Sequence, residues 1–204
     1  MARRTKEDAL ATREGILDAA ELLFVQQGVS GTTLQHIASA AGVTRGAIYW
    51  HFEDKGAMFN AMMERAKMPL ESALEVLDRT DAADPLHDLR NYMQCVLRLT
   101  VEDPKARRVF EIALLKLEFV GELDAVRERR QHGQEIWMKR AESRIRLAIK
   151  HGQAKRSLAP RAVALGMFAM LEGLIRIWLL DPESFDLVKL GGQIVDTQLD
   201  SLRA

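Results

Sequence analysis

The sequence predicts an all-α protein: a compact three-helix unit at the N-terminus, followed by a larger helical body. Apolar residues recur every three or four positions along nearly every segment, and no stretch alternates with the period of two that strands require. Glycine and proline are sparse, with 13 and 5 residues among 204. Two short helical segments joined by a tight turn containing glycine lie near the N-terminus, a spacing typical of a helix-turn-helix.

The N-terminal unit begins with a helix predicted over residues 6–27, which Gly28 can end as a C-cap. A second, short helix is predicted over residues 34–41. After the turn "GVT", the hydroxyl of Thr44 can cap a third helix over residues 45–52. The second and third helices would form the helix-turn-helix pair.

The chain is predicted to divide into domains 1–53 and 54–204. In the second domain, Pro69 should bend or interrupt the first helix, and Gly121 should end the third. The six helices expected there cover residues 54–78, 85–100, 104–119, 122–151, 161–180 and 184–202.

Bulk properties exclude several classes of protein. The chain carries 29 acidic and 29 basic residues, which excludes a protein that binds polyanions through overall positive charge but not one with a local basic patch. Cys95 is the single cysteine, so an internal disulfide and a CxxC zinc site are excluded, and a reducing cytoplasm is favoured. No segment has the pattern of a signal peptide or a membrane span, and we expect no membrane partner.

Catalytic motifs are missing from the sequence. The five histidines show no metal-binding spacing, and the chain has no Walker loop, GxGxxG loop or GxSxG motif. Cys95 stands among apolar neighbours, where a buried thiol is usually inert. The sequence therefore predicts a protein that is not an enzyme and has no metal and no cofactor.

The stretch "TRGAIYWHFEDK" places four rings between two cations, although aromatic residues usually lie in a core. On a helix whose N-terminus points at DNA, Arg45 can reach a base edge in the major groove, and Ala47 can touch a thymine methyl group. Tyr49, His51 and Lys55 are suited to phosphate contacts. The pattern favours a DNA-recognition helix.

The same rings have a plainer interpretation. Ile48 and Phe52 lie four apart on one helical face and can anchor the helix to a core, while the neighbouring rings cap that core and the charges stay solvated. An N-terminal arm could add phosphate or minor-groove contacts through Arg3, Arg4, Lys6 and Arg13. Acidic residues keep the unit from being net basic. If contacts are few, affinity should come from a paired, dimeric site.

The segment "TTLQHIASAAGVTRGAIYWHFEDKGAMFNAM" resembles the DNA-binding region of the TetR family, and within it the AcrR type, which represses multidrug efflux operons. The resemblance is strong over roughly the first 60 residues and weaker towards the C-terminus. It implies nine helices, a ligand-binding body, a homodimer formed largely by the last two helices, and a palindromic operator of double-stranded DNA. On the matching positions it implies DNA contacts by Thr33, Arg45, Gly46, Ala47, Tyr49, Trp50, His51 and Lys55.

A ligand pocket is expected in the body because two charges stand in an otherwise apolar helix. Glu172 and Arg176 lie four apart, and as a pair facing an interior they would be costly unless they serve a purpose. The alternative is a structural ion pair at a dimer interface. Apolar residues around such a pair would suit a small hydrophobic or cationic molecule. The expected lining consists of Met93, Val96, Phe110, Leu114, Trp137, Phe168, Leu171, Glu172, Ile175 and Arg176.

The last two predicted helices each carry a second apolar stripe, which is more than one core needs. We therefore expect them to form a four-helix bundle with a second copy of the chain. The stripes consist of Val163, Met170, Leu174 and Ile177 on one helix, and of Ile194, Val195, Leu199 and Leu202 on the other.

These features predict a cytoplasmic repressor, associated with the nucleoid when bound to DNA, that leaves its operator when a ligand binds the body. The expected mechanism is a shift of the long helix that begins at residue 54, which changes the distance between the two recognition helices of the dimer. Two alternatives stay open: a repressor of the same type that controls a metabolic or lipid-related operon, and a helical interaction protein that does not bind DNA.

Overall fold

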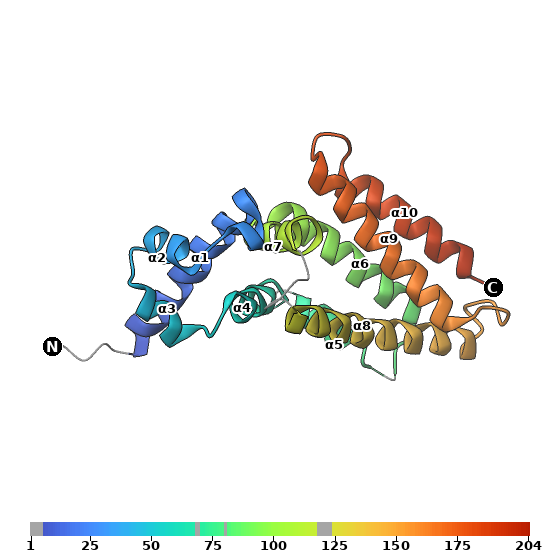
Figure 1. Cartoon of the computed structure of the whole chain (residues 1–204). Coiled ribbons are helices and arrows are strands. Elements are labelled where there is room, and N and C mark those ends of the chain that lie inside the picture. The colour runs from blue at the N-terminus through green and yellow to red at the C-terminus, as the bar shows by residue number, and fades with distance from the viewer. Residues whose placement is uncertain (1–5, 68–69, 80, 118–123) are drawn as a thin grey trace. The chain divides into compact units, whose positions relative to one another are not determined.

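The computed structural model describes residues 6–67, 70–79, 81–117 and 124–204, and within these ranges it contains helices and no strand (Figure 1). The predicted all-α class is confirmed. The described helices are α1 (Lys6–Gly31), α2 (Leu34–Ala40), α3 (Arg45–His51), α4 (Lys55–Lys67), α5 (Glu71–Val76), α6 (Pro85–Glu102), α7 (Pro104–Glu111), α8 (Asp124–Lys150), α9 (Pro160–Leu180) and α10 (Leu187–Leu202), with a π-helical segment η2 (Ile112–Lys116) after α7.

The helix predicted over residues 54–78 differs from the structure, which gives two helices there, α4 and α5. This division raises the number of described α-helices from the nine expected to ten. Pro69, the residue expected to interrupt the segment, and Gly121 lie outside the described residues. The predicted helix over residues 104–119 also differs, because its second half changes from α- to π-helical geometry at Ile112.

The chain forms two compact units. One consists of Met1–Ala66 and Arg108–Arg129, and the other of Lys67–Arg107 and Arg130–Ala204. A domain boundary at residues 53 and 54 stays a prediction. The core of the first unit includes the fully buried side chains of Ile16, Phe24, Ile37, Ile48 and Met58, and that of the second includes Leu86, Met93, Ile145, Met167 and Val195.

Local rules explain how the helices of the first unit begin and end. Thr33 is the N-cap of α2: its Oγ1 accepts a hydrogen bond from the backbone N–H of His36 at 3.1 Å, and the His36 ring accepts one in return. The Thr44 hydroxyl accepts from the Ala47 N–H at 3.1 Å and caps α3, as predicted. These caps fix the turn between α2 and α3.

Gly28 interrupts α1 with φ 77° and ψ 165°, a backbone conformation that is essentially restricted to glycine. We expect Gly28→Ala to lower the free energy of unfolding by about 1–3 kcal/mol, because alanine would be strained there. Gly15→Ala is the matched control, since Gly15 lies exposed inside α1 with no atom within 4 Å of an added Cβ, and it should stabilise the helix by about 0.5–1 kcal/mol. Urea unfolding followed by circular dichroism measures both; equal effects would contradict the assignment.

In the second unit, α6 packs against α10. A Cβ on Gly191 of α10 would lie 3.0 Å from a methyl group of Leu97, so the two helices approach closely at this glycine. The Arg90 guanidinium of α6 also donates to the Asp196 carboxylate at 2.8 Å. This packing corrects part of the predicted dimer stripe, because three of its residues already belong to the core of the protomer: Val195, Leu199 and Leu202.

Helices α8 and α9 run antiparallel within the second unit. The Trp137 and Phe168 rings are 5.6 Å apart, Arg130 pairs with Glu172, and Arg161 donates to Glu135 at 2.8 Å. Higher residue numbers on α8 therefore meet lower numbers on α9. The buried Arg144 of α8 donates to the Leu77 carbonyl at 2.7 Å and so holds the end of α5.

Candidate functional site

Helix α3 presents its most exposed side chains on one polar and aromatic face. Trp50 is 73% exposed and Tyr49 is 50% exposed. The Arg45 guanidinium donates to the Tyr49 hydroxyl at 2.9 Å and lies over the Tyr49 ring, 5.5 Å from its centroid. The tyrosine thus restricts the arginine before any partner is bound, which lowers the conformational entropy lost on binding.

The opposite face of α3 is buried. Ile48 is fully buried and Phe52 is 4% exposed, which confirms the prediction that these two residues anchor the helix. The Arg13 guanidinium of α1 lies 4.9 Å from the Phe52 ring centroid and covers it. The four rings of the motif are therefore divided between core and surface, with His51 half-buried and edge-on to Trp50 at 4.5 Å.

The other predicted DNA contacts lie around this face. Gly46 is exposed and Ala47 is half-buried. The Lys55 ammonium donates to the Val29 carbonyl at 3.1 Å, so part of its hydrogen-bonding capacity serves the unit itself. Thr33 is exposed, but its hydroxyl oxygen already caps α2. The role of all eight residues in DNA contact stays a prediction, and Arg3 and Arg4 lie outside the described residues.

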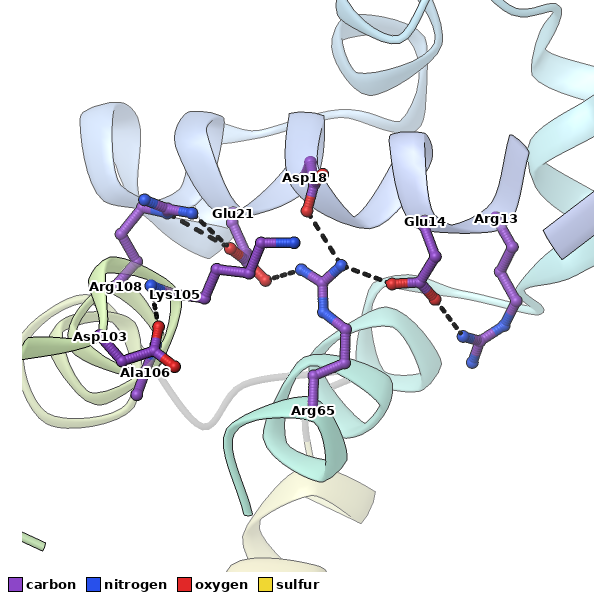
Figure 2. Close-up of polar contacts among 9 residues, drawn as sticks. All are labelled: Arg13, Glu14, Asp18, Glu21, Arg65, Asp103, Lys105, Ala106 and Arg108. Carbon is purple, nitrogen blue, oxygen red and sulfur yellow. Dashed lines mark hydrogen bonds and ion pairs between the residues drawn. The ribbon is translucent and has the colours of Figure 1, made fainter. Parts of the chain in front are cut away.

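A cluster of charged side chains holds α1, α4 and α7 together within the first unit (Figure 2). The Arg65 guanidinium of α4 donates to Glu14 at 2.8 Å and to Asp18 at 2.9 Å, and it also bonds Glu21. Arg108 of α7 reaches the second oxygen of Glu21 at 3.2 Å. We call these five residues the Glu21 cluster.

Glu21 is fully buried and stands between the two arginines. Burial alone would lower the pKa of Arg65, but its hydrogen bonds to Glu14 and Glu21 outweigh this and raise the pKa well above its usual value. The sequence interpretation missed this cluster. The available signal was the spacing of Glu14, Asp18 and Glu21, which places three acids on one face of a helix that is otherwise anchored by apolar residues.

The second unit gathers part of the predicted ligand lining. Trp137 lies between Tyr92 and Phe168, with ring centroids 6.2 and 5.6 Å away. Four further members are buried in this unit: Met93, Val96, Leu171 and Ile175. Phe110 and Leu114 belong to the first unit, where both are half-buried. A ligand role for these residues stays a prediction.

The prediction that Glu172 forms an ion pair with Arg176 is wrong. Glu172 pairs with Arg130 of α8, whereas Arg176 is exposed. The reason is geometric, because α8 runs alongside α9 and offers a guanidinium across the helix interface. Glu172 is half-buried and stays a candidate lining residue; the exposed position of Arg176 removes the argument that its charge faces an interior.

Helix α9 also carries large apolar side chains that the protomer leaves exposed. Leu165, Ile177 and Leu180 are between 50% and 68% exposed. By length and composition alone α9 could cross a membrane, but it includes the Glu172–Arg130 ion pair and packs against α8 and α10. An apolar face of this kind is typical of a protein–protein interface. Of the predicted stripe on this helix, Ile177 is exposed and the other three residues are half-buried: Val163, Met170 and Leu174.

Comparison with known proteins connects these features to a family. Residues 16–62 match the family described as bacterial regulatory proteins, tetR family, and residues 84–204 match the MAATS-type transcriptional repressor, C-terminal region. The chain is 40% identical over 189 residues to the HTH-type transcriptional regulator AcrR of Shigella flexneri, which covers 93% of this chain and 88% of that protein.

Two solved structures are similar over nearly the whole chain. NalD, the secondary repressor of the MexAB-OprM multidrug efflux pump in Pseudomonas aeruginosa, superposes with a TM-score of 0.88 and 33% identity, covering 97% of this chain and 98% of NalD. A SmeT–triclosan complex gives a TM-score of 0.84 and 34% identity, covering 95% of this chain and 92% of SmeT. SmeT represses the SmeDEF multidrug efflux pump of Stenotrophomonas maltophilia.

The matched regions together span both the helix-turn-helix and the helical body, so the resemblance to the AcrR type of repressor is confirmed. Both family descriptions are of transcriptional regulators, which confirms the prediction that the protein is not an enzyme. The chain belongs to the TetR family of bacterial transcriptional repressors.

Proposed function

We propose that this protein represses an operon for a multidrug efflux pump and leaves its operator when a small hydrophobic or cationic compound binds the helical body. The observation that carries the DNA-binding part is the exposed face of α3, where Arg45 is held against Tyr49 and Trp50 stands free of the core. The similarity to NalD, AcrR and SmeT supports the choice of target operon and of ligand.

Two copies of α3 would read the operator as a pair. The apolar side chains exposed on α9, with Leu190 of α10, supply a surface on which a homodimer can form. A two-fold dimer requires an inverted repeat, with half-sites about one turn of DNA apart or a multiple of it. Because the chain has no net charge, its affinity for the operator would come from two recognition helices binding together and not from a general electrostatic attraction to DNA. A repressor of this kind works in the cytoplasm, on the nucleoid.

The Glu21 cluster can carry the signal between ligand and DNA. Both arginines lie where the chain crosses between the two units. Arg65 precedes Ala66, the last residue of the first segment of the first unit, and Arg108 is the first residue of that unit's second segment. Both bind Glu21, in the middle of α1. A ligand that moves α4 or α7 therefore acts on the helix that supports α3. A coupling of about 1–3 kcal/mol would weaken DNA binding roughly 5- to 150-fold.

Fluorescence anisotropy on a labelled DNA duplex from the region upstream of the gene tests this proposal. With excess unrelated DNA present, we expect specific binding that weakens as salt is added. Triclosan, the compound in the SmeT complex, should release the duplex. Specific binding that triclosan and a panel of hydrophobic drugs leave unchanged would overturn the ligand part of the proposal, and an absence of specific binding would overturn the choice of operator.

A further inference from the structure

Trp137 is the central ring of a row of three aromatic side chains from three different helices. Tyr92 of α6 and Phe168 of α9 flank it, with ring centroids 6.2 and 5.6 Å away. Trp137 is 6% exposed, and Tyr92 is 8% exposed. Aromatic pairs at these separations attract one another through their quadrupoles as well as through apolar contact.

The indole nitrogen of Trp137 is buried, and no hydrogen-bond acceptor among the described residues reaches it. Buried donors nearly always have a partner, because an unsatisfied one costs about 1–3 kcal/mol. An indole N–H can only donate. The atom that would satisfy it must therefore be an acceptor, such as a carbonyl, ether or phenolic oxygen.

The charges beside this row are already balanced. Glu172 stands one helical turn from Phe168, and its carboxylate is paired with Arg130. Burial raises the pKa of Tyr92 far above its usual value, which keeps its hydroxyl neutral. The row therefore offers an entering molecule aromatic contact and a donor. The Glu172 carboxylate beside the row is paired with Arg130, so a cationic ligand would have to compete with Arg130 for this carboxylate.

We infer that the ligand of the helical body is a neutral aromatic molecule with a hydrogen-bond acceptor, and that Trp137 Nε1 donates to this acceptor. Tyr92 and Phe168 supply the aromatic contact. This inference rests on the proposed function for the existence of a ligand site, and it narrows the ligand class from hydrophobic or cationic molecules to neutral acceptors. It also makes Trp137 the residue that determines specificity.

Two matched pairs of probes separate acceptor recognition from hydrophobicity: benzophenone and diphenylmethane, and fluorenone and fluorene. Each pair differs by a carbonyl oxygen in place of two hydrogens. Isothermal titration of the full-length protein should show at least one ketone binding about tenfold more tightly than its partner, the factor expected for one hydrogen bond of about 1.4 kcal/mol. This preference in the unmodified protein needs no variant. Tetraphenylphosphonium, a cationic aromatic probe, should bind more weakly than that ketone.

Trp137→Phe keeps an aromatic ring and removes the donor. It should lower ketone affinity about tenfold and leave the affinity for the methylene partner nearly unchanged, so that the preference disappears. Trp178→Phe is the control, since Trp178 is buried to a similar degree in the same unit, against Arg107, and it should keep the preference. A ketone preference that survives Trp137→Phe, the absence of any preference, tighter binding of the cation, or no binding of any probe would each overturn the inference.

Operator binding distinguishes this inference from the proposed function. Trp137→Phe should bind the operator as tightly as the unmodified protein when no ligand is present, because α3 is unaltered. If the probes bind as expected but the upstream duplex is not bound specifically, the choice of operator in the proposed function fails while the ligand assignment stands.

Discussion

Arg45→Ala is expected to weaken specific operator binding by at least about 30-fold. A good bidentate arginine–guanine contact contributes about 1–3 kcal/mol of discrimination, and a dimer makes it twice, so the smallest expected loss is about 2 kcal/mol, converted at about 1.4 kcal/mol for each tenfold change. Binding to unrelated DNA should change far less, because phosphate contacts carry it. Fluorescence anisotropy on operator and scrambled duplexes measures both quantities.

Arg79→Ala is the matched control for Arg45→Ala. Arg79 is an exposed arginine of the second unit with a surface partner, Asp81, and its removal should leave the ratio of specific to non-specific affinity unchanged. Tyr49→Phe should give an intermediate loss, since it removes the hydroxyl to which Arg45 donates. If Arg45→Ala lowers both affinities equally, Arg45 contacts phosphate and does not read bases. If it dissociates the dimer, Arg45 supports the fold.

Glu21→Ala is expected to lower the free energy of unfolding by about 3 kcal/mol. Removing one partner of a buried ion pair leaves the others uncompensated and typically costs about 3–5 kcal/mol. We expect the lower end because Arg65 keeps Glu14 and Asp18, and because the Arg65 and Arg108 side chains are 15% and 26% exposed. Urea unfolding followed by circular dichroism gives the loss directly.

A double-mutant cycle tests whether the Glu21 cluster acts as a unit. Combining Glu21→Ala with Arg108→Ala should cost clearly less than the sum of the two single losses, because residues in one ion-pair network are not independent. Asp81→Ala, which breaks an exposed pair, should change stability little. Additive losses in the cycle would show that Glu21 and Arg108 do not interact in solution.

The parts of the fold that follow from short-range rules could be predicted from the sequence. Gly28 ends the regular part of α1, Thr44 caps α3, and Ile48 and Phe52 anchor that helix in the core. Each of these depends on residues within four positions along the chain, where backbone geometry and helical spacing determine the outcome. The division of the recognition motif into a buried and an exposed face follows from the same spacing.

Long-range pairs could not be predicted in this way. Glu21 pairs with Arg65, which is 44 positions away in the sequence, and Glu172 pairs with Arg130, which is 42 positions away. A helical pattern shows which face a charge occupies but not which helix lies opposite. The stripe on α10 shows the same limit: Val195 and Leu199 were expected to meet a second copy, but they are buried within the protomer, where α10 packs on α6.

Selection of bound sequences from a pool of randomised DNA duplexes tests the central claim most directly. We expect an enriched inverted repeat, with half-site centres about one turn of DNA apart or a multiple of it, and we expect Arg45→Ala to lose the base preference at one position in each half-site. Enrichment of a single unpaired site, or a repeat that Arg45→Ala leaves unchanged, would contradict the assignment of α3 as a paired recognition helix.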